Sequence, residues 1–342
     1  MKKILFLTLL ATGYYTAAFC QQEDVTKEAL KKKYENSDID KELRKKMQSD
    51  DKYPDSIVLA PLHFVNSFIK LDTAKFEFSS ISLDVEVKTK VPKSYSFYIS
   101  PFNGAINGMP FYAGIQTKSG GKPIEGGNDI SIGRGGIFSR WMERDKGALK
   151  TEGYYSSSDA EGDFISIRNK VKWDKGTYRL TLYKSGEIEG KPLPQNYKSK
   201  EIMFTWGEYE HSWVTMTVEN LKTKEKTIIG SLAFPGKKLM FNAQNIVFLE
   251  QYGAVINFAK EAPKSMYGVI NYKELPDVKL DIKNIMVNGR LIKPAEVITY
   301  HNRTHHPEQS KIAMPIPILS EANYDPKTGV ISYDVGAFKS WK

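Results

Sequence analysis

Three pairs of carboxylates stand two residues apart, the spacing that places two side chains on one face of a β-strand. A glycoside hydrolase needs two carboxyl groups about 5–9 Å apart, and residues i and i+2 of a strand lie about 6.6 Å apart. The pairs are Asp84/Glu86, Glu187/Glu189 and Glu208/Glu210. The first alternates with valines, as on the solvated side of a half-buried strand, and the other two fall in turn-like segments. We therefore predict that all three pairs are solvated surface and not a catalytic pair.

Oxygen-rich loops offer a second kind of chemistry. Asp159, Glu161 and Asp163 alternate in a glycine-containing loop, and Asp129 follows Asn128 in another. Ca²⁺ prefers six to eight oxygen ligands, which such loops can supply. The twelve-residue calcium loop of EF-hands is absent, however, so an ordinary acidic loop is favoured. No cofactor is predicted, with Ca²⁺ kept as the alternative.

Zinc and nucleophile chemistry have weaker support. His301 and His305 have the i, i+4 spacing that binds zinc on a helix, but Pro307 follows them and no glutamate lies between them. A polar loop is the better interpretation. The single cysteine, Cys20, lies in the N-terminal apolar segment, and no Gly-x-Ser-x-Gly nucleophile elbow occurs. Thiol and serine hydrolase mechanisms therefore lack a signature.

Aromatic residues near a glycine-rich loop (residues 118–136) form the remaining candidate site. Sugars stack their C–H faces on aromatic rings, while their hydroxyls bind polar side chains. Tyr112 and Gln116 are expected to share one strand face, with Arg140 on the face of its strand opposite Trp141. The candidate ligand-binding residues are Tyr112, Gln116, Arg134, Arg140 and Glu161, with Asp129 as an auxiliary. The alternative is that most of the tryptophans pack in the core or at its rim.

These residues must be positioned by β-structure. From residue 53 onward, runs rich in Tyr, Phe, Val, Ile and Thr alternate with Gly, Pro, Asn and Asp, and no long amphipathic helix interrupts them. The pattern predicts an all-β antiparallel sandwich, most simply a jelly-roll or concanavalin-like fold, over residues 53–260. Residues 261–342 are predicted to be a β-rich C-terminal extension or a small second domain. Within them, Asn288-Gly289 signals a hairpin, residues 325–336 another, and the segment near Pro315 and Pro317 an edge strand.

The N-terminus indicates export. Lys2 and Lys3 precede a short apolar run, as in a secretory signal peptide covering residues 1–20, and the run is too short for a membrane anchor. Cleavage after Cys20 is preferred to lipidation of that cysteine, because Phe19 is bulky where a lipoprotein signal has a small residue. Residues 21–52 hold nine basic and nine acidic side chains and predict two short helices or a solvated spacer.

The net charge does not indicate nucleic acid as a partner. The formal charge of +9 falls to +7 without Lys2 and Lys3, and the basic residues are interspersed with 40 acidic ones. No basic helix or arginine-rich strip is present. A soluble, lysine-rich surface is the simpler interpretation.

Several short motifs carry a resemblance. The segments YSFYIS, FYAGIQT and GGIFSRW, followed by DAEGD, WDKGTYRLTLY, SWVTMTV and SLAFPG, resemble a family of secreted bacterial proteins known as domain of unknown function 3472. The resemblance covers about residues 55–255. It implies a lectin-like β-sandwich, often from polysaccharide-processing bacteria, without an established reaction. This chain departs from the family's pattern in the longer glycine-rich loop and in Met142-Glu143 after the Trp.

The sequence thus predicts an exported bacterial protein, secreted, periplasmic or at the cell surface. It is expected to bind a glycan or polysaccharide without catalysis. Two alternatives stay open: a glycoside hydrolase or lyase on the same sandwich, and a structural envelope protein. The identity of the glycan and the oligomeric state are not encoded in any visible pattern.

Overall fold

The computed structural model describes residues 57–60, 62–158, 163–192, 208–252, 268–271, 275–304 and 317–341. Nearly all of them belong to one compact unit, residues 56–157 and 163–342. Its secondary structure is almost entirely β, with one short 3₁₀ turn, η1 (Lys146–Ala148). The predicted all-β, antiparallel architecture is confirmed, because the strands form two large antiparallel sheets. The predicted helices in residues 21–52 lie outside the described residues.

The first large sheet has nine strands. Its spatial order is β18-β19-β15-β3-β10-β11-β12-β7, with β16 paired to β15. The strands are β3 (Ser80–Val87), β7 (Leu149–Lys150), β10 (Gly176–Ile188), β11 (His211–Asn220), β12 (Lys226–Pro235), β15 (Val278–Val287), β16 (Arg290–Leu291), β18 (Pro317–Asp325) and β19 (Val330–Trp341).

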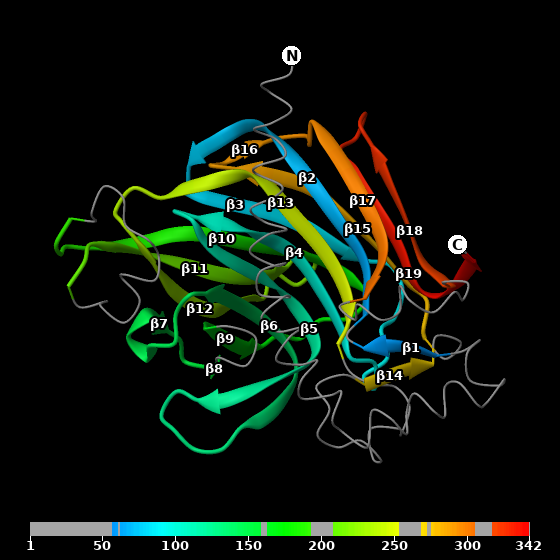
Figure 1. Cartoon of the computed structure of the whole chain (residues 1–342), viewed down its shortest axis with the longest axis horizontal. Coiled ribbons are helices and arrows are strands. Elements are labelled where there is room, and N and C mark those ends of the chain that lie inside the picture. The colour runs from blue at the N-terminus through cyan, green and yellow to red at the C-terminus, as the bar shows by residue number, and fades with distance from the viewer. Residues whose placement is uncertain are drawn as a thin grey trace, which may run out of the picture. The chain divides into compact units, whose positions relative to one another are not determined.

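The second large sheet has eight strands in the order β17-β2-β13-β4-β5-β6-β9-β8 (Figure 1). Its members are β2 (Leu62–Glu77), β4 (Phe97–Ile106), β5 (Met109–Pro123), β6 (Ile130–Trp141), β8 (Tyr154–Ser158), β9 (Phe164–Lys170), β13 (Met240–Gln251) and β17 (Glu296–Thr304). A separate pair, β1 (Ile57–Ala60) and β14 (Gly268–Asn271), completes the described strands.

The two large sheets pack face to face around one apolar core. Phe111 on β5 and Phe138 on β6 meet Phe234 on β12 of the other sheet, with ring centroids 6.1 and 6.2 Å apart. All three side chains are at most 2% exposed. Aromatic and β-branched side chains fill such an interior well, because they stand perpendicular to the pleated sheets and interdigitate. The fold is therefore a β-sandwich.

The C-terminal extension adds strands to both sheets. β15, β18 and β19 extend the nine-stranded sheet, and β17 forms an edge of the eight-stranded one. The predicted Asn288-Gly289 hairpin is confirmed: both residues have positive φ (48° and 77°) and join β15 to β16. β18 and β19 form the second predicted hairpin, and β18, which begins at Pro317, lies at the sheet edge as predicted. Pro315 lies outside the described residues.

One strand boundary differs from the sequence prediction. The run FEFSSISLDVEV (residues 76–87) is rich in strand-forming residues and by that pattern predicts a single strand. In the structure the chain turns at Phe78 and Ser79, and the run divides between β2 and β3, which belong to different sheets. Asn288 holds this turn, because its side-chain oxygen accepts hydrogen bonds from the Ser79 and Ser80 amides at 2.9 and 3.0 Å. The partner that fixes the turn is about 210 residues away in the chain, so local alternation does not signal it.

Candidate binding face

The outward side of the eight-stranded sheet carries the densest set of groups suited to binding. On β5, Phe111, Ala113 and Ile115 point into the core, so Tyr112 and Gln116 point outward by strand alternation. The register places Tyr112 opposite Ser139 on β6, and Ser139 opposite Ser166 on β9. Gln116 lies opposite Tyr98 on β4.

Six aromatic rings form a continuous chain across this face, which we call the aromatic face. The members are His63, Phe248, Tyr98, Tyr112, Trp141 and Phe164, from β2, β13, β4, β5, β6 and β9 in turn. Successive ring centroids lie 4.9, 5.2, 6.2, 6.3 and 5.7 Å apart. Tyr98 is buried at the centre, and the other five are partly exposed. Partly exposed rings on an outward sheet face are available to stack on a ligand.

A carboxylate and a histidine form a pair at one end of this chain. Glu250 lies 3.4 Å from His63, at side-chain exposures of 13% and 12%. Glu250 is also the cross-strand neighbour of Tyr98. Burial raises the pKa of Tyr98, and the neighbouring Tyr112 and Glu250 raise it further. Tyr98 is therefore a neutral hydrogen-bonding group at physiological pH.

Tyr252 closes the same end of the face. Its hydroxyl donates to the Lys118 carbonyl at 2.8 Å and accepts from the Lys118 amide at 2.9 Å, which ties the end of β13 to β5. Burial raises its pKa, an effect that these bonds oppose. The tyrosine therefore stays protonated while it holds two strands of the face together.

Arg168 extends from β9 toward these tyrosines. Its Nη1 is buried and has no hydrogen-bond partner. Burial lowers the pKa of Arg168, whereas Tyr112, Tyr98, Asp129 and Tyr252 raise it. A guanidinium keeps its charge under such conditions, because its ordinary pKa is above 12. Arg168 thus places a positive charge beside the tyrosines.

Of the six residues predicted from the sequence, the structure brings two together on this face, Tyr112 and Gln116. Asp129 is exposed in the loop before β6 and acts electrostatically on Arg168. Glu161 lies outside the described residues. Arg134 lies elsewhere, where its guanidinium covers the Trp173 ring at 4.6 Å and lies 3.7 Å from Asp174.

The structure does not bring Arg140 to the aromatic face. It does lie opposite Trp141, as predicted, but Trp141 is the residue that points outward. Arg140 pairs with Phe111 in the register and points into the sandwich, where it is 1% exposed. Its guanidinium donates to the Ala233 carbonyl and lies 3.8 Å from Glu143, which is fully buried. Arg140 therefore joins the two sheets.

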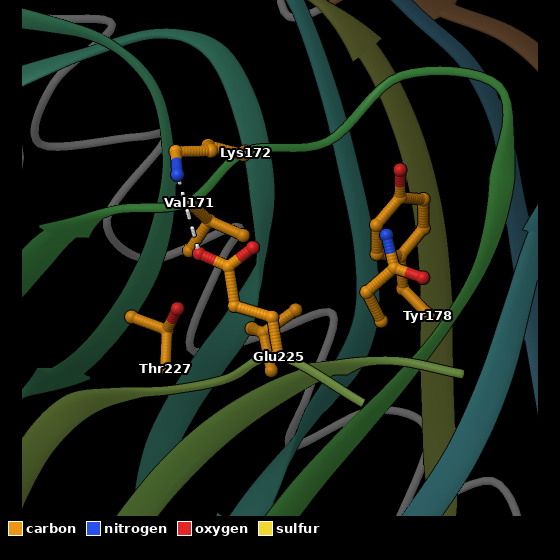
Figure 2. Close-up of a pocket in the computed structure, with 7 residues that line it drawn as sticks. Val171, Lys172, Tyr178, Glu225 and Thr227 are labelled. Carbon is orange, nitrogen blue, oxygen red and sulfur yellow. Dashed lines mark ion pairs between the residues drawn. The ribbon is translucent and has the colours of Figure 1, made fainter. Parts of the chain in front are cut away.

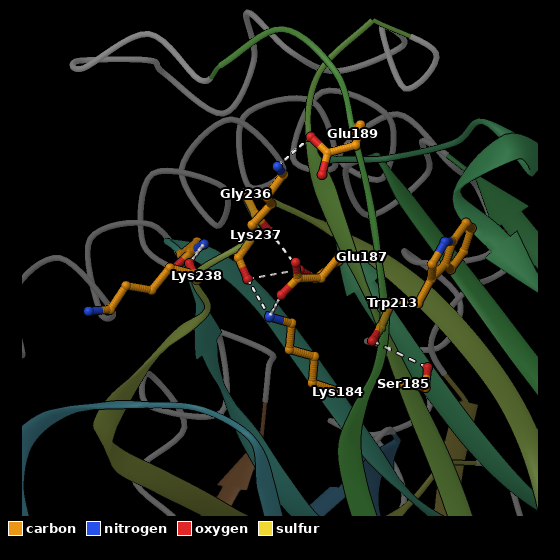
Figure 3. A network of polar contacts seen from close by, with 10 residues as sticks. Lys184, Ser185, Glu187, Glu189, Trp213, Gly236, Lys237 and Lys238 are labelled. Carbon is orange, nitrogen blue, oxygen red and sulfur yellow. Dashed lines mark hydrogen bonds and ion pairs between the residues drawn. The ribbon is translucent and has the colours of Figure 1, made fainter.

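Five of the six carboxylates in the three pairs, all except Glu210, form ion pairs within the described part of the chain. Glu187 and Glu189 form ion pairs with Lys184 and Lys237 (Figure 3), and Glu208 pairs with Lys191 at 3.1 Å. These contacts are surface ion pairs, as expected. In the pair Asp84/Glu86, Glu86 forms a partly exposed ion pair with Lys283, but Asp84 is buried, which the sequence did not predict.

Asp84 is not solvated but 1% exposed. The Arg179 guanidinium donates two hydrogen bonds to its carboxylate, of 2.7 and 2.9 Å, and the Asn284 side-chain amide donates a third of 2.8 Å. The alternation with valines correctly places Asp84 on the outward face of β3. It does not reveal that Arg179 and Asn284 cover the carboxylate there. The carboxylate is a structural ion-pair partner.

Neither a pocket elsewhere on the surface nor a metal-ligand cluster in the described residues offers a second candidate site. A surface pocket lined by Val171, Tyr178, Thr227 and the Lys172–Glu225 ion pair (Figure 2) has about 10 Å³ of free volume, the space of one water molecule. Among the residues that the structure describes, no group of three or more His, Cys, Asp or Glu could hold a metal ion. The proposed Ca²⁺ loop lies partly outside this set, since residues 159–162 are not described.

Sequence reasoning missed Arg168, Tyr98 and Glu250. Each lies in a run that the sequence does mark as a strand, so its outward orientation follows once the core side is known. The sequence does not show which face of β4, β9 and β13 is the core side, because these strands carry apolar residues on both faces. The available signal was a charged residue, Arg168, inside the strand-like run FISIRNK, flanked by residues that alternate in polarity.

Comparisons with known proteins add no functional assignment. No family model matches the chain, and no curated protein matches it. Structural similarity was found to scytalido-glutamic peptidase with a transition state analog inhibitor (8% identity, TM-score 0.39) and with a peptide-based analog (8%, 0.38). SCP-B of the eqolisin peptidase family, in complex with the tripeptide Ala-Ile-His, is also similar (9%, 0.32). Each match covers 82% of this chain and 100% of the other. At these TM-scores the similarities support no inference about activity.

Within the described part of the chain, no helix is both long and apolar enough to span a membrane.

Proposed function

We propose that this protein is an exported, lectin-like β-sandwich that binds glycan through its aromatic face. The observation that carries the proposal is the chain of six rings on the outward side of one sheet, five of them partly exposed. The predicted signal peptide supports export, and the two antiparallel sheets agree with a concanavalin-like sandwich.

The chemistry of the face suits a sugar. Tyr112 and Trp141 are adjacent, partly exposed rings whose faces can stack on pyranose C–H groups. Gln116 and the carboxylate of Glu250 are polar groups on the same side of the sheet, available to sugar hydroxyls. Such a set, apolar rings with a few fixed polar groups, is typical of small-ligand sites.

A polysaccharide-active enzyme is the second candidate. It is favoured by one observation, the Glu250–His63 pair on the aromatic face, which places a carboxylate beside a second titratable group. A structural envelope protein without a sugar site is the third interpretation, in which the rings serve packing between neighbouring strands.

Affinity electrophoresis through gels containing single polysaccharides distinguishes the three. We expect retardation of the wild-type protein by at least one polymer, and loss of that retardation in Tyr112→Ala and Trp141→Ala. Tyr300→Ala is the matched control, because Tyr300 is a 45% exposed ring at the β17 edge, where it contacts Phe68. No retardation by any polymer contradicts glycan binding. Release of reducing ends, abolished by Glu250→Gln, favours the enzyme.

A further inference from the structure

Building on the proposed function, we propose that the aromatic face selects acidic glycans, and that Arg168 binds their carboxylate or sulfate group. The inference concerns the class of sugar bound.

Arg168 differs from the other buried or partly buried arginines that the structure describes. Arg179 has Asp84 at 2.7 Å, Arg134 has Asp174 at 3.7 Å and Arg140 has Glu143 at 3.8 Å. Arg168 has no carboxylate within 4 Å among the described residues, and this sets it apart. Its Nη1 also has no hydrogen-bond partner, a feature that it shares with the Nη1 of Arg134. Burial of a cation without an ion-pair partner is unfavourable, because the cation loses hydration without a compensating contact. A fold retains such a cost where the charge serves binding.

The surroundings of Arg168 leave its charge accessible from the aromatic face. In the register, Arg168 lies opposite Ile137, and Ile137 lies opposite Gly114. The next outward pair along these two strands joins Gln116 on β5 to Gly135 on β6, so a second glycine lies on this side of the sheet. Backbone atoms occupy the space beside both glycines, since a Cβ on Gly114 would lie 2.0 Å from the Ile99 carbonyl oxygen and one on Gly135 2.8 Å from the Asn169 carbonyl oxygen. Access to the charge therefore comes from Arg168 itself, which is partly exposed on this side of the sheet.

The groups around the guanidinium leave it able to bind an anionic group of a sugar. The largest electrostatic contributions to Arg168 from side chains come from three tyrosines and Asp129. Burial raises the pKa of Tyr98, so it stays a neutral hydroxyl; it accepts from Ser100 and keeps its own proton to donate to an oxyanion or a sugar oxygen. The Tyr252 proton is already donated to the Lys118 carbonyl. One planar guanidinium matches a carboxylate or sulfate with two parallel N–H···O bonds. The neighbouring rings match the sugar that carries that group.

Two hydroxyls add to the unsatisfied polar groups beneath this region. Ser139 and Ser166 are fully buried, and neither Oγ has a hydrogen-bond partner. The two residues lie opposite each other on β6 and β9, one alternation along from Ile137 and Arg168. Together with the Nη1 of Arg168 they place three unsatisfied polar atoms on neighbouring outward positions, although such atoms also occur in the core, at Tyr95 and Tyr333.

The test compares polymers that differ only in charge. The full-length protein is run in affinity gels containing polygalacturonate or its fully methyl-esterified form, and dextran sulfate or neutral dextran. We expect tighter binding to the charged member of one pair. Arg168→Gln should weaken that binding about 10- to 100-fold, the range for a charged hydrogen-bond pair. Arg290→Gln, at an exposed arginine on β16, is the matched control for net charge and should change little.

The polymer arms separate the two acidic groups and the two proposals. Preference for polygalacturonate over its methyl ester identifies a carboxylate ligand, and preference for dextran sulfate over dextran a sulfate ligand. Equal binding to charged and neutral members, unaffected by Arg168→Gln, overturns the selectivity for acidic sugars and leaves glycan binding intact. No binding to any of these polymers or to neutral xylan and mannan overturns both proposals.

The Tm of Arg168→Gln distinguishes a role of Arg168 in binding from a role in the stability of the fold. Because Arg168 has no ion-pair partner among the described residues, we expect Arg168→Gln to leave the Tm unchanged or to raise it. A lowered Tm together with equal loss of binding to every polymer contradicts the inference, because Arg168 would then support the fold and not the ligand. Retained Tm with selective loss of acidic binding supports it.

Discussion

Replacement of Arg140 by methionine tests how the sandwich tolerates a buried charge. Arg140 is 1% exposed and Glu143 is fully buried, with Nη2 and Oε2 separated by 3.8 Å. Two unit charges at that distance attract by about 4 kcal/mol at an effective dielectric constant of about 20. Methionine fills a similar volume but leaves the Glu143 carboxylate without its cation, a change that costs about 3–5 kcal/mol when the pair is buried.

The structure places the expected loss near the lower end of that range. Glu143 keeps two hydrogen bonds through Oε1, from the Arg144 and Asp145 amides at 2.8 and 2.7 Å. The Ala233 carbonyl, however, loses its donor from Arg140. We expect Arg140→Met to lower the free energy of unfolding by about 3 kcal/mol at pH 7.5, measured by urea denaturation.

The loss should depend on pH with a defined sign. Burial raises the pKa of Glu143 above 4.5, and Arg140 opposes the rise, so the substitution raises it further. Between 4.5 and the raised pKa the folded state binds more protons than the unfolded state, and stability therefore falls as pH increases. The variant should accordingly be less destabilised at pH 5 than at pH 7.5.

A double variant provides the control. Arg140→Met combined with Glu143→Gln removes both charges, and the amide oxygen of glutamine can still accept the two backbone hydrogen bonds. We expect the double variant to recover at least about 1 kcal/mol relative to Arg140→Met at pH 7.5, because an unpaired buried charge is no longer present. A loss below about 1 kcal/mol in Arg140→Met, or an equal loss at both pH values, would refute the reasoning.

Two further substitutions test the framework of each sheet. Gly114→Ala should destabilise the protein by more than about 3 kcal/mol, because the new Cβ would lie 2.0 Å from the Ile99 carbonyl oxygen. Gly108→Ala is the control and should cost about 1 kcal/mol, because Gly108 has open space around it and a φ of +78°. Equal losses of unfolding free energy in urea titrations would contradict this. Arg179→Met should cost about 2 kcal/mol, since it removes both of the Arg179 hydrogen bonds to buried Asp84 while solvent screens the one-third exposed arginine. Asp84→Asn in the same background should recover part of that loss, and no recovery would show that the charge of Asp84 is not the cause.

The β-type architecture could be predicted because its signals are local. Alternating Tyr, Phe, Val, Ile and Thr define strands wherever they occur, and Asn288-Gly289 specifies a two-residue turn through positive φ at both positions. The division of residues 76–87 between two sheets could not be predicted in the same way. Its cause, the contact of Asn288 with Ser79 and Ser80, joins segments that only the folded chain brings together.

The candidate site was predictable in part for the same reason. Tyr112 and Gln116 were correctly placed on the side of β5 opposite Phe111, because β5 alternates clearly between core and outward residues. β6 does not: Ile137, Phe138, Ser139 and Arg140 are all at most 1% exposed, although they point alternately to the two sides of the sheet. When both faces of a strand are covered, burial no longer follows polarity, and sequence alone cannot tell which face is the core.

Arg140 and Arg168 show what that ambiguity means for function. Both are arginines inside apolar strand segments of neighbouring strands, so they look equivalent in the sequence. The register gives them opposite orientations: Arg140 shares the core side with Phe111, and Arg168 shares the outward side with Ile137. The core arginine has a buried carboxylate beside it and a carbonyl acceptor across the sandwich, so the fold itself satisfies its charge. The outward arginine has neither an ion pair nor a hydrogen bond for Nη1 within the described residues. A charge that the fold satisfies contributes to stability, whereas one that the fold leaves unsatisfied has a role only when a ligand supplies the missing partner. Of the two, Arg168 is therefore the residue on which we base the recognition of an acidic sugar.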